Sequence, residues 1–172
     1  MYDRNKFTFV VLTAFVFMFS IICISLSSSY GLDEEEPKWN VSFNAVNVVD
    51  STASLYDDVK LKKNSTSLSK LGFIFDNVGD TITYRINVLN SGNIDAVISS
   101  ILLSRAVCSD TTYCDSLDYS LTYENGSTVS RGDTLPKNSG VVMLLTFRHI
   151  GTTQESDVTI KDIDFSINYV EG

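Results

Sequence analysis

From residue 39 onwards, apolar and polar positions alternate along the chain and predict β-strands. Apolar side chains occupy every second position in residues 39–45, 82–88, 117–123, 141–147 and 163–169. A period of two places alternate side chains on opposite faces of a strand, one face in a core and the other in water. No stretch after residue 38 keeps the 3.6-residue period of an amphipathic helix.

Short turn signals separate these segments. They are Val78-Gly79-Asp80, Asn90-Ser91-Gly92-Asn93, Asn125-Gly126 and the stretch 137–140. Asn-Gly is favoured where both central positions of a hairpin take positive φ. Short strands separated in this way predict an all-β domain over residues 39–172. We expect an antiparallel two-sheet β-sandwich of about seven to nine strands, with an Ig-like or a jelly-roll topology.

The N-terminal part of the chain has a different pattern, because no charged residue occurs from Phe7 to Leu26. A helix of this length spans about 30 Å, the thickness of the hydrocarbon core of a bilayer. Arg4 and Lys6 precede the apolar run, and acidic residues 33–36 follow it. This asymmetry predicts that residues 1–6 lie in the cytoplasm and that the rest lies outside, with one hydrophobic helix over residues 7–27.

Two interpretations of this helix remain open. It is either an uncleaved signal anchor or a signal peptide removed near the small residues Ser27, Ser28, Ser29 and Gly31. Residues 28–38 are acidic and end close to Pro37, which is typical of a linker. We therefore expect the domain outside the cytoplasm, either attached to the cell membrane through the helix or secreted to the cell surface.

Charge narrows the range of partners. The whole chain has 13 Lys and Arg against 21 Asp and Glu, a formal net charge of −8. Only Asp3, Arg4 and Lys6 precede the apolar run, so the remainder carries a net charge of −9. Such an acidic domain argues against nucleic acid as a partner.

Two of the three cysteines, Cys108 and Cys114, lie outside the apolar run, six positions apart. Two cysteines cannot make a structural zinc site, which takes four ligands. In an exported domain they predict a disulfide that closes one short loop.

The sequence contains no recognisable catalytic or cofactor-binding constellation. Its single histidine, His149, is expected at the surface at the end of a strand. Asp110, Asp115 and Asp118 flank the cysteine loop and are candidate calcium ligands, but they lack the spacing of a known calcium loop and are interpreted first as solvated turn residues. The tripeptide Arg131-Gly132-Asp133 is interpreted as a turn that leads into a strand.

One stretch carries a family resemblance. Residues 79–96 read GDTITYRINVLNSGNIDA, and a second Gly-Asp at Gly132-Asp133 precedes a later strand. The stretch resembles conserved-repeat sandwich domains of bacterial and archaeal surface proteins. It is also similar to the TasA/camelysin family of biofilm-matrix fibre subunits. The positions that carry the resemblance form the turn motif: Gly79, Asp80, Tyr84, Asn90, Gly92 and Ala96.

The resemblance implies two roles, and a third is kept open beside them; none of the three needs a cofactor. The first is a non-enzymatic bacterial surface module acting in adhesion, envelope structure or the extracellular matrix, with other surface proteins as partners. The second is a cleaved fibre subunit that polymerises with itself by donor-strand complementation, with residues 39–49 as the donor strand. A sensor ectodomain that binds a small ligand or calcium is the third. Some camelysin relatives are described as metallopeptidases, but this chain has one histidine and no H-E-x-x-H motif.

Overall fold

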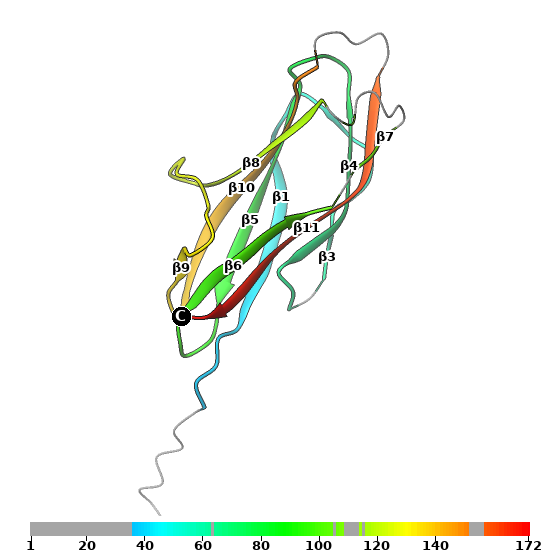
Figure 1. Ribbon diagram of the computed structural model, residues 1–172. Coiled ribbons are helices and arrows are strands. Elements are labelled where there is room, and N and C mark those ends of the chain that lie inside the picture. Colours follow the sequence, from blue (N-terminus) through cyan, green and yellow to red (C-terminus); the bar gives the residue numbers. More distant parts are fainter. Residues whose placement is uncertain (1–35, 63, 105, 109–113, 115, 152–156) are drawn as a thin grey trace, which may run out of the picture. The chain divides into compact units, whose positions relative to one another are not determined.

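The computed structural model describes residues 36–172, apart from residues 63, 105, 109–113, 115 and 152–156 (Figure 1). The predicted helix from Phe7 to Leu26 and most of the linker lie outside the described residues. In the part of the chain that is described, no helix is long and apolar enough to span a membrane. Pro37–Gly172 form one compact unit.

The domain consists of two antiparallel sheets packed face to face, so the prediction of an all-β, two-sheet sandwich is confirmed (Figure 1). The first sheet has the order β1 (Val41–Ser51), β5 (Thr81–Asn90), β10 (Ser139–His149) and β8 (Leu117–Tyr123). The second has the order β2 (Ser54–Leu55), β4 (Ser67–Phe75), β11 (Val158–Glu171), β6 (Ala96–Leu103) and β9 (Thr134–Leu135), with β3 (Lys60–Leu61) paired to β4 and β7 (Val107–Cys108) paired to β11.

The alternation in the sequence is confirmed in the three central strands. In β5, β10 and β11 the inward side chains are almost fully buried. They are Ile82, Tyr84, Ile86 and Val88, then Met143, Leu145 and Phe147, then Ile163, Phe165, Ile167 and Tyr169. Phe147 lies at the centre of an aromatic cluster, with its ring centroid 5.1 Å from that of Phe73 and 6.3 Å from that of Tyr84.

Strand β1 departs from the predicted pattern. Val41 and Phe43 point into the core as expected, but Trp39 precedes the strand and is 39% exposed. A β-bulge between Phe43 and Ala45 then shifts the alternation by one residue. Val46, rather than Ala45, packs against the core after the bulge.

Strand β4 was missed in the sequence because its alternation is interrupted. Lys70 adopts a positive φ of 60°, and Leu71 and Phe73 are buried on either side of Gly72. In the neighbouring strand β11, Asp162 has a φ of 57°. The register between the strands shifts at these positions. Two facing irregularities therefore let both strands return their apolar side chains to the core.

The Asn125-Gly126 turn also differs from the expected hairpin. Gly126 has a φ of +86°, but Asn125 is not among the residues with positive φ. Instead, Oδ1 of Asn125 accepts hydrogen bonds from the backbone N–H and the hydroxyl of Ser127. The side chain thus supplies a local turn that replaces the second positive φ.

The expectation that His149 lies at the surface is wrong. His149 is 1% exposed, and its ring stacks on Phe75 with centroids 5.7 Å apart and planes 7° from parallel. The physical reason is that the alternation of β10 continues one step beyond Phe147 and places His149 on the inner face. Its backbone also pairs with Gly79 and Asp80.

We predict that Phe147→Ala lowers the free energy of unfolding by about 3–5 kcal/mol, because it leaves a cavity among the packed aromatic rings. Leu102→Ala is the matched control, since Leu102 is 53% exposed and its truncation should change stability by about 0.5 kcal/mol at most. Urea unfolding followed by circular dichroism measures both variants. Equal losses in the two would contradict the core described here.

Candidate functional site

Four of the six residues of the turn motif lie at the two ends of β5, whereas Tyr84 lies in the middle of that strand and Ala96 at the start of β6. At the start of the strand, Gly79 has a φ of +92°, a conformation that favours glycine. Asp80 is 9% exposed, and its Oδ2 accepts hydrogen bonds from the backbone N–H groups of Asp76 and Asn77. The Gly-Asp pair therefore closes the turn that leads from β4 into β5.

Tyr84 lies in the middle of β5 with its side chain fully inside the sandwich, as the alternation over residues 82–88 predicts. Among the described residues its hydroxyl has no hydrogen-bond partner. Burial raises the pKa of Tyr84 well above its ordinary value, so the phenol stays neutral. Ala96 begins β6 and is also fully buried.

Asn90, at the end of β5, is fully buried and uses the complete hydrogen-bonding capacity of its side-chain amide. Its Oδ1 accepts from the backbone N–H of Asn40 at 3.2 Å and from that of Gly92 at 3.0 Å. Its Nδ2 donates to the backbone oxygens of Ile94 at 3.0 Å and Leu135 at 3.2 Å. One side chain thus joins three separate parts of the chain.

Residues 90–95, here called the Asn90 turn, also hold the segment that leads into β1. The backbone N–H of Ser91 donates to the oxygen of Asn40, and that of Asn93 donates to the oxygen of Lys38. Oδ1 of Asn93 accepts from the backbone N–H of Lys38 at 2.7 Å. The N-terminal side of the sandwich domain is therefore fixed before its first strand begins.

Gly92 is required here by close approach of two backbones. A Cβ built on Gly92 would contact the backbone oxygen of Lys38 and would lie 2.7 Å from both the Cα of Trp39 and the N of Asn40. Any larger residue must displace the segment 38–40 from the turn.

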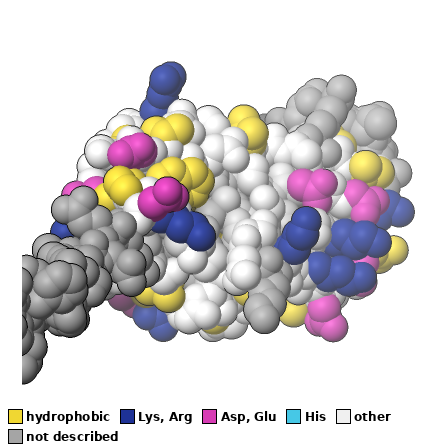
Figure 2. Space-filling view, turned by 90° about the horizontal axis from the view of Figure 1, so that it is seen from below, with side chains coloured by type: hydrophobic (Ala, Val, Ile, Leu, Met, Phe, Trp, Pro, Cys, Tyr) yellow, Lys and Arg dark blue, Asp and Glu magenta, His cyan; other side chains and the backbone are white. Residues whose placement is uncertain are grey.

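Two further segments reach the Asn90 turn. Asp95 accepts from the backbone N–H of Gly172 through its backbone oxygen and from that of Lys137 through its carboxylate. The first strand, the loop before β10 and the last residue of the chain therefore meet at one end of the domain. Seen from this end, acidic and basic side chains are interspersed with small apolar groups (Figure 2).

The disulfide predicted between Cys108 and Cys114 is present, with Cα atoms 5.7 Å apart. Cys108 belongs to β7, where it pairs with Ile160 of β11, so the closed loop is attached to the second sheet. A bond closing so short a loop contributes on the order of 2 kcal/mol by restricting the unfolded chain.

The calcium candidates are only partly described. Asp110 and Asp115 lie outside the described residues. Asp118 is exposed on β8, and its Oδ1 accepts a hydrogen bond from the backbone N–H of Tyr119. Within the described residues, no group of three or more His, Cys, Asp or Glu side chains could hold a metal ion.

The turn interpretation of Arg131-Gly132-Asp133 is confirmed. Gly132 has a φ of +94°, and the backbone N–H of Asp133 donates to the oxygen of Ser130. The Asp133 carboxylate does more than close this turn. Its Oδ2 accepts from the backbone N–H of Ser130 at 2.8 Å and from the hydroxyl of Tyr123 at 2.9 Å.

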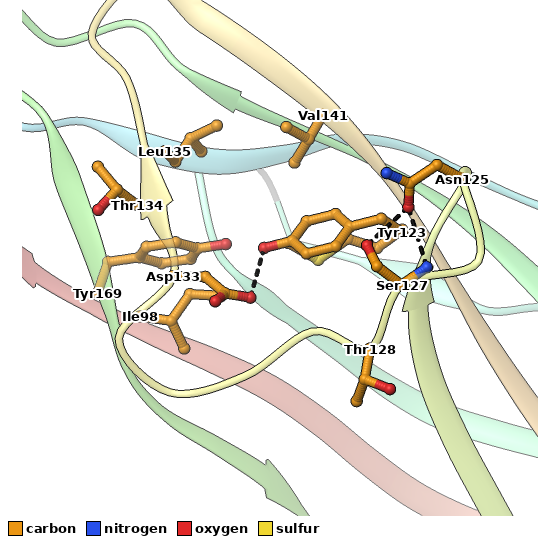
Figure 3. A pocket seen from close by; sticks show the side chains of 11 residues that line it. Ile98, Tyr123, Asn125, Ser127, Thr128, Asp133, Thr134, Leu135, Val141 and Tyr169 are labelled. Atoms are coloured by element: carbon orange, nitrogen blue, oxygen red, sulfur yellow. Dashed lines mark hydrogen bonds between the residues drawn. The ribbon is translucent and has the colours of Figure 1, made fainter.

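Tyr123, Asp133 and Tyr169 line a cavity of about 490 Å³ that the sequence analysis did not identify (Figure 3). The alternation assigned both tyrosines to inner strand faces, but β8 and β11 belong to different sheets. No spacing along the chain therefore indicates that the two hydroxyls lie close together. Only the Asp-containing turn was visible in the sequence.

We predict that Asn90→Ala lowers the free energy of unfolding by about 2–4 kcal/mol, because four backbone groups lose a hydrogen-bond partner, two in buried and two in partly buried positions. Asn47→Ala, at an exposed position on β1, is the matched control and should change stability by about 0.5 kcal/mol at most. Urea unfolding followed by fluorescence of Trp39, the single tryptophan, reports on this end of the domain. Similar stabilities for both variants would contradict a central role for Asn90.

Comparison with known proteins identifies no relative, since no family model, curated protein or solved structure matches this chain.

Proposed function

We propose that this chain is a non-enzymatic cell-surface protein whose β-sandwich acts in adhesion, envelope structure or the extracellular matrix. In this proposal the uncharged segment from Phe7 to Leu26 anchors it in the membrane, and residues 39–172 lie outside the cytoplasm. The observation that carries the proposal is the Cys108–Cys114 disulfide in an acidic domain that follows an apolar, uncharged run. Disulfides persist in oxidising compartments and are rare in the cytosol.

The attachment of the first strand suits a tethered module. A pull on the N-terminal segment would reach the sandwich at Lys38 and Asn40, where the Asn90 turn holds both residues through backbone hydrogen bonds. The load would then be shared among β1, the loop before β10 and the C-terminal residue, because all three bind the same turn.

Of the two expected sandwich topologies, we propose the jelly roll. In the Ig-like arrangement several consecutive strands are neighbours within one sheet. Here the strands from β4 to β11 alternate between the two sheets, except that the two-residue strand β7 follows β6 in the second sheet. The order β4-β11-β6-β9 in one sheet and β5-β10-β8 in the other matches a chain that winds around the sandwich, as in a double-sheet jelly roll.

The location is testable with the full-length protein carrying a C-terminal tag in bacterial cells. We expect external protease to remove the tag from intact cells, and a maleimide polymer to label Cys108 and Cys114 only after reduction. Cys23 is replaced by alanine in this experiment, so that labelling reports the disulfide alone. Protection of the tag in intact cells, or two free thiols without reduction, would overturn the proposal. Intact mass of the membrane and secreted fractions distinguishes an anchor from a cleaved signal peptide.

A second candidate function is a cleaved fibre subunit that assembles by strand exchange. The observation in its favour is that β1 is the first strand of the described part of the chain and an edge strand, and that among the described strands it pairs within its sheet with β5 alone. A second copy could supply the same strand, with Val41 and Phe43 entering the core and residues 38–40 binding the same Asn90 turn.

Strand exchange predicts that Gly92→Ala blocks polymers, because its Cβ excludes the backbone of residues 38–40 from either copy. Gly126→Ala is the matched control: its φ is also positive and strains alanine, but nothing lies within 4 Å of the added Cβ. Electron microscopy and sedimentation of the mature protein measure assembly. Polymers that form equally in both variants, or wild-type protein that never assembles at high concentration, would exclude this candidate.

A further inference from the structure

A cavity opens between the two sheets on the side where β8 and β9 lie. Its volume of about 490 Å³ falls within the range of about 300–1,000 Å³ that is typical of small-ligand sites. Its lining combines apolar side chains of the sandwich interior, such as Leu135 and Met143, with polar groups from the loops after β8 and before β9. One wall is therefore apolar and the other can form hydrogen bonds.

Tyr169 provides the observation that points to a ligand. Its side chain is 5% exposed, and among the described residues its hydroxyl has no hydrogen-bond partner. Buried polar groups nearly always have a partner, so an unsatisfied one needs an explanation. In Figure 3 the hydroxyl of Tyr169 points along the cavity towards that of Tyr123. A hydroxyl of a bound molecule would complete the hydrogen bonding of this group.

The other polar groups are arranged to both accept and donate. The hydroxyl of Tyr123 donates to Oδ2 of Asp133, which leaves the lone pairs of Tyr123 and Oδ1 of Asp133 as acceptors. Thr128 and Thr134 add hydroxyls that can donate or accept. Burial raises the pKa of both tyrosines, and in Tyr123 the Asp133 carboxylate adds to this, so both phenols remain protonated.

We propose that this cavity binds a neutral sugar residue, with Tyr169, Tyr123 and Asp133 as the groups that recognise its hydroxyls. A sugar ring has apolar C–H faces and hydroxyls that each donate and accept, which matches the mixed lining. Among the described residues, no Lys, Arg or His lines the cavity, so no side chain there would neutralise an anion. This inference rests on the proposed surface function for access to glycans, but its test does not depend on where the protein is located.

An organic cation is the competing ligand, because Asp133 is acidic and two aromatic side chains are near. The geometry favours the sugar. Recognition of a cation by aromatic rings requires their faces, whereas Tyr123 and Tyr169 turn their hydroxyl ends towards each other (Figure 3). Asp133 also already accepts two hydrogen bonds on Oδ2, which partly compensate its charge.

The test uses ligand-observed NMR titration of the full-length protein in a polyoxyethylene detergent, which carries neither a sugar nor an ammonium group. The probes are glucose, galactose and N-acetylglucosamine, with tetramethylammonium and n-butylammonium as the cationic alternatives. We expect saturable binding of at least one sugar with a millimolar Kd, the range for a ligand of so few atoms.

Tyr169→Phe should weaken sugar binding about tenfold, the loss expected for one buried hydrogen bond. It should also raise the Tm of the ligand-free protein, because it removes an unsatisfied buried hydroxyl, so a failure to fold is not expected. Tyr119→Phe is the matched control, since Tyr119 is 45% exposed on β8 and does not line the cavity. The affinity of the Tyr119→Phe variant for the sugar should equal that of the wild type.

Three results would overturn the proposal: no saturable binding of any sugar, equal affinity in Tyr169→Phe and the wild type, or binding of the ammonium probes in preference to sugars. In the last case Asp133→Asn should abolish binding and identify a cation site. If the protein binds sugar but protease cannot reach its tag in intact cells, the sugar site stands and the proposed surface function is excluded. If protease removes the tag but the protein binds no sugar, the surface function stands and the sugar site is excluded.

Discussion

The hydrogen bonding of one buried amide, that of Asn90, is the constraint on which the arrangement of this sandwich depends. A buried primary amide is costly unless both its oxygen and its nitrogen are satisfied. Here the partners come from the segment before β1, from the turn itself and from the end of β9. Because Asn40 and Leu135 lie 50 and 45 residues from Asn90 in the sequence, satisfying Asn90 fixes how distant segments meet.

The Asn90 turn also explains why the residue two positions after Asn90, Gly92, is a glycine. Segment 38–40 can donate to and accept from the turn only if the two backbones approach closely, and Gly92 permits that approach. This end of the domain is thus held by backbone hydrogen bonds together with the side chains of Asn90, Asn93 and Asp95. In either proposed role, tethered module or exchangeable strand, it would be the point where the first strand is attached.

The cavity between the sheets follows from how the sandwich closes. β8 is one of the two edge strands of its sheet, and β9, at an edge of the other, contains only two residues. A strand that short covers little of the core beside it, and the loops around Tyr123 and Asp133 line the remaining opening. The cavity therefore lies at an edge that the sheets leave incompletely covered, where loops can vary without disturbing the core.

The all-β class, the inward faces of β5, β10 and β11, and the disulfide could all be predicted from the sequence alone. These features depend on local periodicity and on two cysteines close together in the chain. The sequence could not reveal β4, whose alternation is interrupted at Lys70, nor the register change in β1, because a bulge is settled by pairing with a neighbouring strand. His149 does lie at the end of its strand, but the alternation of β10 carries its side chain to the inner face instead of the surface.

The contacts made by four polar residues could be seen only in the tertiary structure. They are Asn90, Tyr123, Asp133 and Tyr169. In the sequence, Asn90 is one turn residue among several, and Tyr123 and Tyr169 are ordinary inward positions of separate strands. Strand order brings their polar atoms together, and strand order depends on contacts between residues far apart in the chain. The local pattern therefore specified which side chains face inward, whereas the fold specified which of them meet.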